Sequence, residues 1–143
     1  MTQRPAVFLD TSGLFAAAGH RTAGADEPAR RALDRLLASG TRLVTSDLVV
    51  AEFHGLTLGR FGPAVALGAT RLLLQTPRVE IGATGADRLQ AGLTFLAARP
   101  GRRLSMADAV SMLLMREHGI ETAFTLDDDF RAEGFATIPD LGF

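Results

Sequence analysis

Acidic side chains stand at two places where this sequence predicts the end of a buried strand. Asp10 ends the apolar run Ala6–Leu9, and the acids Asp127 to Asp129 follow the apolar segment Ala123–Leu126. In open α/β sheets, ligands bind beyond the carboxyl ends of the strands, so carboxylates there indicate a ligand site. The competing explanations are an N-cap for Asp10 and a solvated loop for the run. Spacing alone does not say which acid of the run would face a metal.

Glu52 lies on a predicted helix that is strongly apolar. Leu48 and Leu56 flank it at a distance of four residues, and Val49 precedes it by three, so its carboxylate falls within an apolar stripe. Burying an unpaired carboxylate is costly. We therefore expect Glu52 to contact a cation or several hydrogen-bond donors, or to form an internal ion pair.

Asp108 lies near the start of another predicted helix. With Ser105 and Ser111 it forms a polar line at a spacing of three residues on an otherwise apolar helix. The segment from Ser105 to Asp108 also matches a capping box, in which the serine and the acid satisfy the helix N-terminus. Capping and ligand binding are compatible roles for one carboxylate.

The convergence of these acids predicts a metal site made of oxygen ligands. Carboxylates packed together repel one another and raise their own pKa values unless a hard cation binds, and such ligands suit Mg²⁺ or Mn²⁺. The chain has no cysteine, and His20, His54 and His118 lack the close spacing of a helical zinc site, so we expect the histidines to be structural. Metal-assisted hydrolysis of a phosphodiester by an activated water is the chemistry that fits.

The elements that must position the acids alternate between strand and helix. Strands are predicted at Ala6–Leu9, Arg42–Thr45, Val79–Ile81, Thr122–Thr125 and Ala136–Ile138. Helices are predicted directly after Asp10, at Glu27–Ser39, Leu48–Leu58 and Ala64–Gln75, from a capping box at Thr84–Asp87 to about Ala98, and at Ser105–His118, with a turn at Gly59–Pro63. This alternation predicts an α/β fold with a doubly wound parallel sheet.

Composition limits the class of protein. With 143 residues, 47% of them hydrophobic, we expect residues 1–143 to form a single domain. We find neither a secretory leader nor an apolar stretch long enough to span a bilayer, which predicts a cytoplasmic protein without membrane contact. The formal net charge of −1 means that an RNA substrate would need a local basic patch. Arg102 and Arg103 could hold a phosphate, although such pairs are more often solvated.

The absence of lysine weakens two rival interpretations. All 15 basic residues are arginine. A phosphatase of the haloacid-dehalogenase kind or a receiver domain would also place an aspartate after its first strand, but both families normally add a lysine, and Ser12 stands where the phosphatase motif has its second aspartate. A third alternative is a binding module without catalysis, against which the presence of all the acids argues.

Four segments of the chain resemble the PIN-domain family, and within it the VapC-type toxins. They are Val7–Ser12, Thr45–Phe53, Leu104–Ala109 and Thr125–Phe130, which agree with the family in order, spacing and context. The resemblance implies a PIN-like fold of about five parallel strands with helices on both faces. It also implies an endoribonuclease that acts as the toxin of a type II toxin–antitoxin pair.

The resemblance further implies roles for single residues. Asp10, Glu52, Asp108 and Asp127 would form an acidic tetrad around one or two Mg²⁺ or Mn²⁺ ions, with Asp129 as an auxiliary metal ligand. Hydroxyl groups at Thr11, Ser12 and Thr125 would line or brace the site. The implied partners are an RNA substrate, a cognate VapB-like antitoxin and a second copy of the chain. The apolar excess of Leu48–Leu58 and Ala64–Gln75 independently favours an interface, and hence a homodimer.

Overall fold

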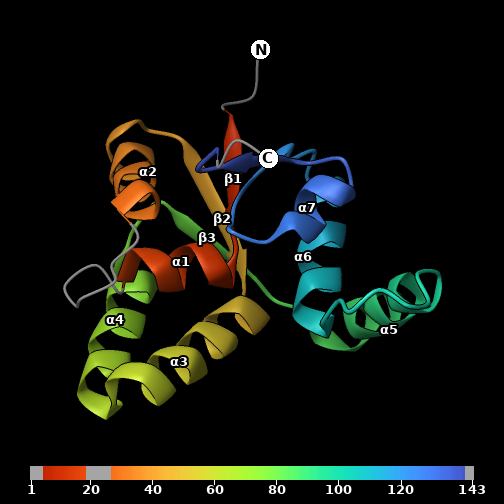
Figure 1. Cartoon of the computed structure of the whole chain (residues 1–143), viewed down its shortest axis with the longest axis horizontal. Helices are drawn as coiled ribbons and strands as arrows, with labels where there is room; N and C mark the ends of the chain where they lie inside the picture. Colours follow the sequence, from red (N-terminus) through yellow and green to blue (C-terminus); the bar gives the residue numbers. More distant parts are fainter. Residues whose placement is uncertain (1–4, 19–26, 141–143) are drawn as a thin grey trace.

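A parallel sheet forms the centre of the molecule. The computed structural model describes residues 5–18 and 27–140. The sheet has the strand order β3-β2-β1-β4-β5, and every neighbouring pair is parallel (Figure 1). The five strands are β1 (Ala6–Leu9), β2 (Arg42–Ser46), β3 (Val79–Gly82), β4 (Thr122–Phe124) and β5 (Ala136–Ile138). The predicted doubly wound α/β fold is confirmed.

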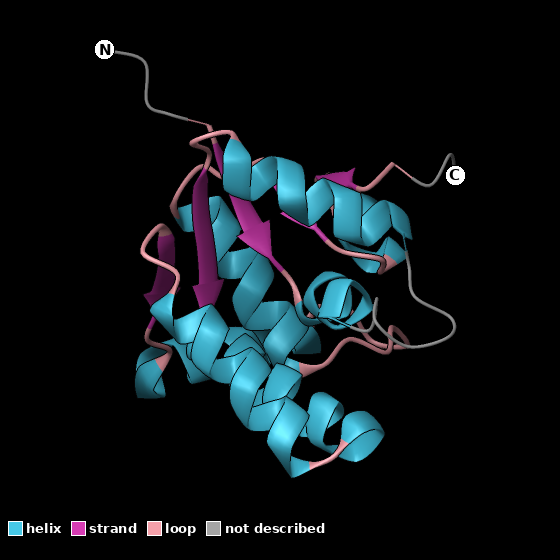
Figure 2. Ribbon diagram, turned by 90° about the vertical axis from the view of Figure 1, so that its left-hand side faces the viewer, coloured by secondary structure: helices cyan, strands magenta, loops and turns pink. Residues whose placement is uncertain are grey.

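Helices connect the strands and cover both faces of the sheet. In Figure 1, α1 and α2 lie on one side of β1 and β2, and α6 and α7 lie on the other. Figure 2 shows the same layering from the side. The described helices are α1 (Thr11–Ala18), α2 (Glu27–Ala38), α3 (Asp47–Phe61), α4 (Pro63–Gln75), α5 (Gly85–Ala97), α6 (Met106–Glu117) and α7 (Asp128–Ala132). Within the described residues, no helix has the length and apolar character needed to cross a membrane.

The strand order places a topological switch point between β1 and β4. From β1 the chain continues to β2 and β3 on one side, whereas β4 continues to β5 on the other. Loops that leave the carboxyl ends of two such strands diverge, which opens a crevice for ligands. Asp10 follows β1 directly, and Asp127 lies three residues after the end of β4. The fold therefore brings both acids to the crevice.

The core is built from the strands and from the helix faces that cover them. Phe8, Leu43 and Phe124 are fully buried on neighbouring strands, and Met112 and Met115 of α6 are fully buried as well. Strands that are covered on both faces need continuous apolar runs, which explains why β1 and β4 consist almost entirely of apolar residues. This packing holds the ends of β1 and β4 rigidly in place.

Two local predictions are wrong. The predicted turn at Gly59–Pro63 is reduced to Gly62, whose φ of 88° ends α3, while Pro63 begins α4. Gly59 and Arg60 continue the helix because an isolated glycine is tolerated there at modest cost. Thr84 makes no capping hydrogen bond, so the predicted capping box does not form. Its backbone amide and hydroxyl instead donate to the carboxylate of Asp47, at the start of α3.

Candidate metal centre

Asp10 is a buried carboxylate held by two hydroxyl groups. It follows β1, and its backbone amide still donates to the carbonyl of Phe124 on β4, at 3.0 Å. Only 4% of the residue is exposed. Its Oδ2 atom accepts hydrogen bonds from Ser12 Oγ and Thr125 Oγ1, both at 2.8 Å, and a longer one of 3.4 Å from the Ser12 amide. The carboxylate therefore has a fixed position.

Ser12 and Thr125 also tie Asp10 to the loop after β4. Ser12 Oγ accepts from the Leu126 amide at 2.9 Å, and Thr125 Oγ1 accepts from the Asp127 amide at 3.0 Å. The two hydroxyl oxygens lie 3.0 Å apart. The bracing expected of these hydroxyls is thus seen at two of the three positions. Thr11 Oγ1 is buried without a hydrogen-bond partner among the described residues.

Of the three acids after β4, two are candidate metal ligands and one is solvated. Asp127 is the N-cap of α7, because its Oδ1 accepts from the Asp129 amide at 2.9 Å. The side chains of Asp127 and Asp129 come close together, whereas Asp128 is exposed. The structure thus identifies Asp127 and Asp129 as candidate ligands and Asp128 as a solvated neighbour. The spacing of the three acids in the sequence did not distinguish them.

Asp108 completes the group from a separate part of the chain. The predicted capping box is confirmed: the Asp108 amide donates to Ser105 Oγ at 3.1 Å, and the Ser105 amide donates to Asp108 Oδ2 at 3.0 Å. Ser111, the other member of the polar line, is buried and donates to the Ala107 carbonyl instead. Since capping engages only Oδ2 of Asp108, its other carboxylate oxygen has no partner among the described residues. The role as a cap and the role as a ligand can coexist.

Asp108, Asp127 and Asp129 form what we call the acid cluster. One carboxylate oxygen from each lies within 4.8 Å of the other two. All three are partly buried. Three oxygen donors at this separation are a donor set suited to a hard divalent cation, which takes carboxylates and waters as ligands. The residues present therefore fit Mg²⁺ or Mn²⁺.

The electrostatics of the acid cluster favour binding of a cation. Burial raises the pKa of Asp127 to about 6, and the negative charges of Asp129 and Asp108 add to the rise. Burial also raises the pKa of Asp108, with the charges of Asp10 and Asp129 acting in the same direction. The pKa of Asp10 is raised by burial, against the opposing hydrogen bonds from Thr125 and Ser12. A divalent cation would relieve this repulsion and restore the ionised forms.

Two of the five predicted metal ligands lie outside the acid cluster. Asp10 is close enough for its charge to act on Asp108, but it is not one of the three carboxylates that meet. Glu52 lies on the second turn of α3 and is exposed, as is Leu56. The expectation that Glu52 is buried in an apolar stripe is wrong, because Glu52 and Leu56 face solvent while Val49 alone of the stripe is fully buried. Its role as a ligand stays a prediction.

Of the two arginines considered as phosphate ligands, Arg102 instead contacts the acid cluster. Arg102 donates to Asp129 Oδ1 at 3.0 Å and also to Glu133, so it is an internal partner of acids and not a free phosphate ligand. Arg103 is exposed and has no partner among the described residues. Glu133 was not singled out at all, since no spacing in the sequence links it to Arg102.

The histidines agree with a structural role where they are described. His118 is the C-cap of α6, where a positive charge would be favourable. His54 lies on α3 and is half-buried. His20 lies outside the described residues. Neither described histidine belongs to the acid cluster.

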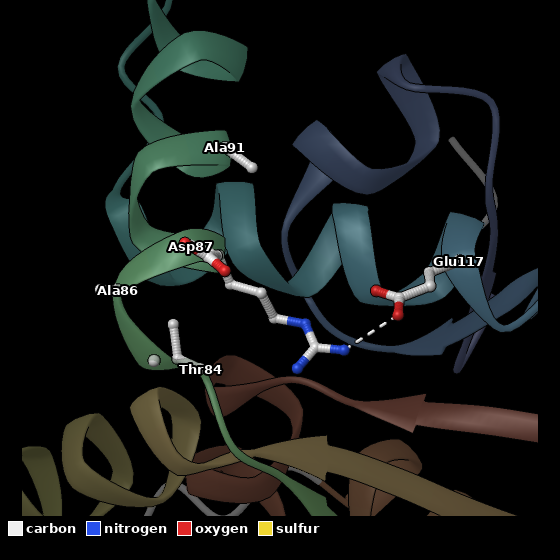
Figure 3. Close-up of a pocket in the computed structure, with 7 residues that line it drawn as sticks. Thr84, Ala86, Asp87, Ala91 and Glu117 are labelled. Carbon is white, nitrogen blue, oxygen red and sulfur yellow. Dashed lines mark hydrogen bonds and ion pairs between the residues drawn. The ribbon is translucent and has the colours of Figure 1, made fainter.

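A separate pocket of about 510 Å³ lies between the start of α5 and the end of α6 (Figure 3). Arg88 is one of the lining residues, and its guanidinium donates to Glu117 at 2.9 Å and to the Ala83 carbonyl at 2.8 Å. None of the three clustered acids lines this pocket. The pocket is therefore separate from the candidate metal centre.

Comparison with known proteins identifies the matching family. The family model for the PIN domain matches residues 7–135. The 23S rRNA-specific endonuclease VapC20 of Mycobacterium tuberculosis is 33% identical over 133 residues, which cover 92% of this chain and 97% of VapC20. The crystal structure of VapC20, described as a toxin that cleaves the sarcin–ricin loop, superposes with a TM-score of 0.76 over 91% of this chain and 96% of VapC20.

More distant structures share the fold. VapBC2 from Rickettsia felis is 14% identical, with a TM-score of 0.67 over 92% of this chain and 96% of that one. FitAcB from Neisseria gonorrhoeae is 17% identical, with a TM-score of 0.59 over 92% of this chain and 95% of that one. At these identities the likeness concerns the arrangement of strands and helices alone.

Proposed function

Since this chain belongs to the PIN domain family, we propose that it is a divalent-metal-dependent endoribonuclease. The observation that carries the proposal is the acid cluster of Asp108, Asp127 and Asp129, with Asp10 beside it, at the switch point of the sheet. The likeness to VapC20 over nearly the whole chain supports it, because that protein is described as an RNA endonuclease. Neither argument depends on the other.

Each acid would contribute differently to binding of the ion. Asp108, Asp127 and Asp129 offer the nearest set of oxygens, and Asp10 adds a negative charge at the carboxyl end of β1. Glu52, which is exposed on α3, would supply the remaining carboxylate of the predicted tetrad of Asp10, Glu52, Asp108 and Asp127. A bound Mg²⁺ or Mn²⁺ would activate water for attack on a phosphodiester and offset the negative charge that develops there. Hydrogen bonds from Ser12 and Thr125 hold Asp10 in place and favour its ionised form, against the larger opposing effect of burial.

We propose ribosomal RNA as the first substrate to test, because VapC20 is described as specific for 23S rRNA. At 33% identity, this chain and VapC20 can share a metal centre and still differ in the loops around it. The substrate class therefore rests on the likeness to VapC20, while the chemistry rests on the acids of this chain.

The proposed partners are a VapB-like antitoxin and a second copy of this chain. VapC20 is described as a toxin, and a toxin that cleaves RNA requires an inhibitor in the cell that makes it. The second copy is supported by apolar side chains that α3 and α4 leave exposed, among them Leu56, Leu67 and Leu72. We place the protein in the cytoplasm, where its RNA substrate and its antitoxin would be found.

The proposal is tested by incubating purified protein with a 23S rRNA hairpin that carries the sarcin–ricin loop. A scrambled RNA of the same length serves as the control. We expect internal cleavage of the hairpin with Mg²⁺ or Mn²⁺ and none in excess EDTA. The proposed reaction needs a metal ion to activate water, and EDTA removes that ion from its carboxylate ligands. Cleavage of undiminished rate in EDTA would refute the metal dependence. Metal-dependent cleavage of the scrambled RNA, without cleavage of the hairpin, would refute the proposal that ribosomal RNA is the substrate.

A further inference from the structure

Arg102 connects the acid cluster to a second charged group that the catalytic proposal does not use. Its Nη2 atom donates to Asp129 Oδ1 at 3.0 Å, and its Nη1 atom donates to Glu133 Oε1. Asp129 and Glu133 stand at the start and just past the end of α7. The guanidinium therefore spans a helix that lies directly beside the metal centre.

Glu133 holds Arg102 firmly. The Glu133 side chain is only 7% exposed and is held by two more arginines. Arg99 donates to both of its oxygens, at 2.7 and 3.0 Å, while stacking on Phe95 at 3.5 Å, and Arg116 donates to Oε2 at 2.9 Å. The hydrogen bond from Arg99, followed by that from Arg102, lowers the pKa of Glu133 to about 2 against the opposing effect of burial. Glu133 is a permanently charged anchor that fixes where the Arg102 guanidinium lies.

The charges make this contact significant for metal binding. An arginine stays protonated in proteins, so Arg102 is a fixed positive charge against one of the three clustered carboxylates. A divalent cation that enters the acid cluster must share Asp129 with that guanidinium or displace it. Both the repulsion between cations and the occupied oxygen oppose binding of the metal.

We propose that Arg102, anchored by Glu133, is a built-in competitor for the divalent ion: it pairs with Asp129 in the metal-free protein and weakens binding of the metal. The proposal rests on the proposed function, because it treats the acid cluster as the metal site. It makes Arg102 a positioning residue that acts through Asp129. A phosphate-binding role is disfavoured because the guanidinium already pairs with two carboxylates, which offset its positive charge.

The chain offers a matched control in the next residue. Arg103 carries the same charge but is exposed and has no partner among the described residues. Arg102→Gln and Arg103→Gln therefore remove equal charge, and only the first frees Asp129. Arg102→Lys keeps the charge but loses the planar fork that joins two acids at once.

The test is isothermal titration of Mn²⁺ into the wild type and each variant, without RNA. We expect Arg102→Gln to tighten Mn²⁺ binding about tenfold, as a Coulomb estimate for the loss of one nearby charge suggests, and Arg103→Gln to change it by less than about twofold. Arg102→Lys should fall between the wild type and Arg102→Gln. In EDTA, Arg102→Gln should also melt below Arg103→Gln, because Asp129 then lacks its counter-ion.

The outcomes separate this inference from the proposed function. A wild type that binds no Mn²⁺ at millimolar concentration would contradict the metal centre itself. A wild type that binds Mn²⁺, with Arg102→Gln equal to Arg103→Gln or weaker than the wild type, would overturn the competitor role and leave the metal centre standing. Should Arg102→Gln fail to fold, the comparison of Arg102→Lys with the wild type decides, and equal affinity for Mn²⁺ would overturn the inference.

Discussion

Asp127 serves the fold and the metal centre at the same time, and the two roles have opposite consequences for stability. Its carboxylate caps α7 through the Asp129 amide, which stabilises the helix. Burial raises the pKa of the same carboxylate to about 6, and the charges of Asp129 and Asp108 nearby add to the rise. The ionised carboxylate is therefore unfavourable in the metal-free fold.

Asp127→Asn separates the two roles, since asparagine caps a helix nearly as well as aspartate but carries no charge. The folded-state pKa of Asp127, about 6, lies above the ordinary value of 3.8. The electrostatic penalty is therefore fully present above pH 6 and disappears as the pH falls towards 3.8. In EDTA we expect Asp127→Asn to melt above the wild type at about pH 8, and the gap to vanish near pH 4.

Thermal melts across that pH range measure this difference, with Asp128→Asn as the control because Asp128 is exposed and outside the acid cluster. If Asp127→Asn melted below the wild type at high pH, the carboxylate would be stabilising, and burial and repulsion together would not outweigh its role as a cap.

Single residues were predictable where a local pattern determines their place. Asp10 follows an apolar strand and Asp108 belongs to a capping box, so both positions could be derived from their neighbours in sequence. Within the run after β4, only the resemblance singled out Asp127. Glu52 was expected to be buried, because helical spacing shows which residues share a face but not whether another element covers it. The link from Arg102 to Glu133 joins residues 31 apart, and no local pattern reveals it.

At the scale of the elements, α1 must pack directly against β4 for Asp10 to meet the loop that carries Asp127. Gly13 makes this approach possible. A Cβ atom at this position would come within 2.6 Å of the Phe124 carbonyl oxygen and 2.7 Å of its ring. The backbone of β4 cannot yield as a flexible side chain would. The absence of a side chain at Gly13 therefore keeps α1, and with it Asp10, next to β4.

Gly13→Ala should destabilise the protein by about 1–3 kcal/mol, the usual cost of overpacking, and should also reduce RNA cleavage. Gly55→Ala in α3 is the matched control, because no atom lies within 4 Å of its added Cβ. It should stabilise the fold by about 0.5–1 kcal/mol, since alanine is the better helix former. Urea denaturation measures both. Equal effects of the two substitutions would show that contact with β4 does not limit the packing of α1.

Strands and helices were predicted well where hydrophobic periodicity is strong, and their boundaries less well. The predicted helix Leu48–Leu58 extends to Phe61 because Gly59 does not stop it, whereas Gly62 does by adopting a positive φ. The capping box at Thr84 failed for a tertiary reason: Asp47, 37 residues earlier, accepts from both its amide and its hydroxyl. A cap inferred from four adjacent residues cannot account for a competing acceptor from another helix.

At the scale of the whole molecule, the surface of α3 and α4 is more apolar than an isolated small domain requires. Leu72 is 69% exposed, and Leu67 and Leu74 are each 54% exposed. Apolar surface in contact with water is unfavourable by about 25 cal/mol per Å², so covering these side chains would stabilise an assembly. This is the surface that we propose for the second copy of the chain.

Light scattering at tens of micromolar, about where moderate interfaces assemble, should give the mass of a homodimer. Leu72→Glu should shift the protein towards the monomer, because a charge would then have to be desolvated in the interface. Leu93→Glu on α5 is the control, since Leu93 is also 54% exposed but lies on a different helix. A wild type that is monomeric at this concentration, or a dimer that Leu72→Glu leaves intact, would contradict the assignment of this surface.

The strand order β3-β2-β1-β4-β5 is a property of the whole chain that residue patterns alone do not determine. Alternating strands and helices predict a parallel doubly wound sheet, but several strand orders satisfy that pattern. The resemblance to the PIN-domain family implied about five parallel strands, and the structure supplies their order. The order matters for the site, because only neighbouring β1 and β4 bring Asp10 beside the loop that carries Asp127.

One comparison tests the central claim most directly. The claim is that RNA cleavage depends on an ion held by Asp108, Asp127 and Asp129. The initial rate of RNA cleavage in saturating Mn²⁺ is measured for the wild type, Asp108→Asn and Asp128→Asn. Asparagine at residue 108 can still accept from the Ser105 amide, so the capping box survives while a charged ligand is lost. We expect the rate of Asp108→Asn to fall at least about a hundredfold, as for the loss of a metal ligand or its support, and Asp128→Asn to retain the wild-type rate. Equal rates for Asp108→Asn and the wild type would contradict the assignment of the acid cluster as the catalytic metal centre.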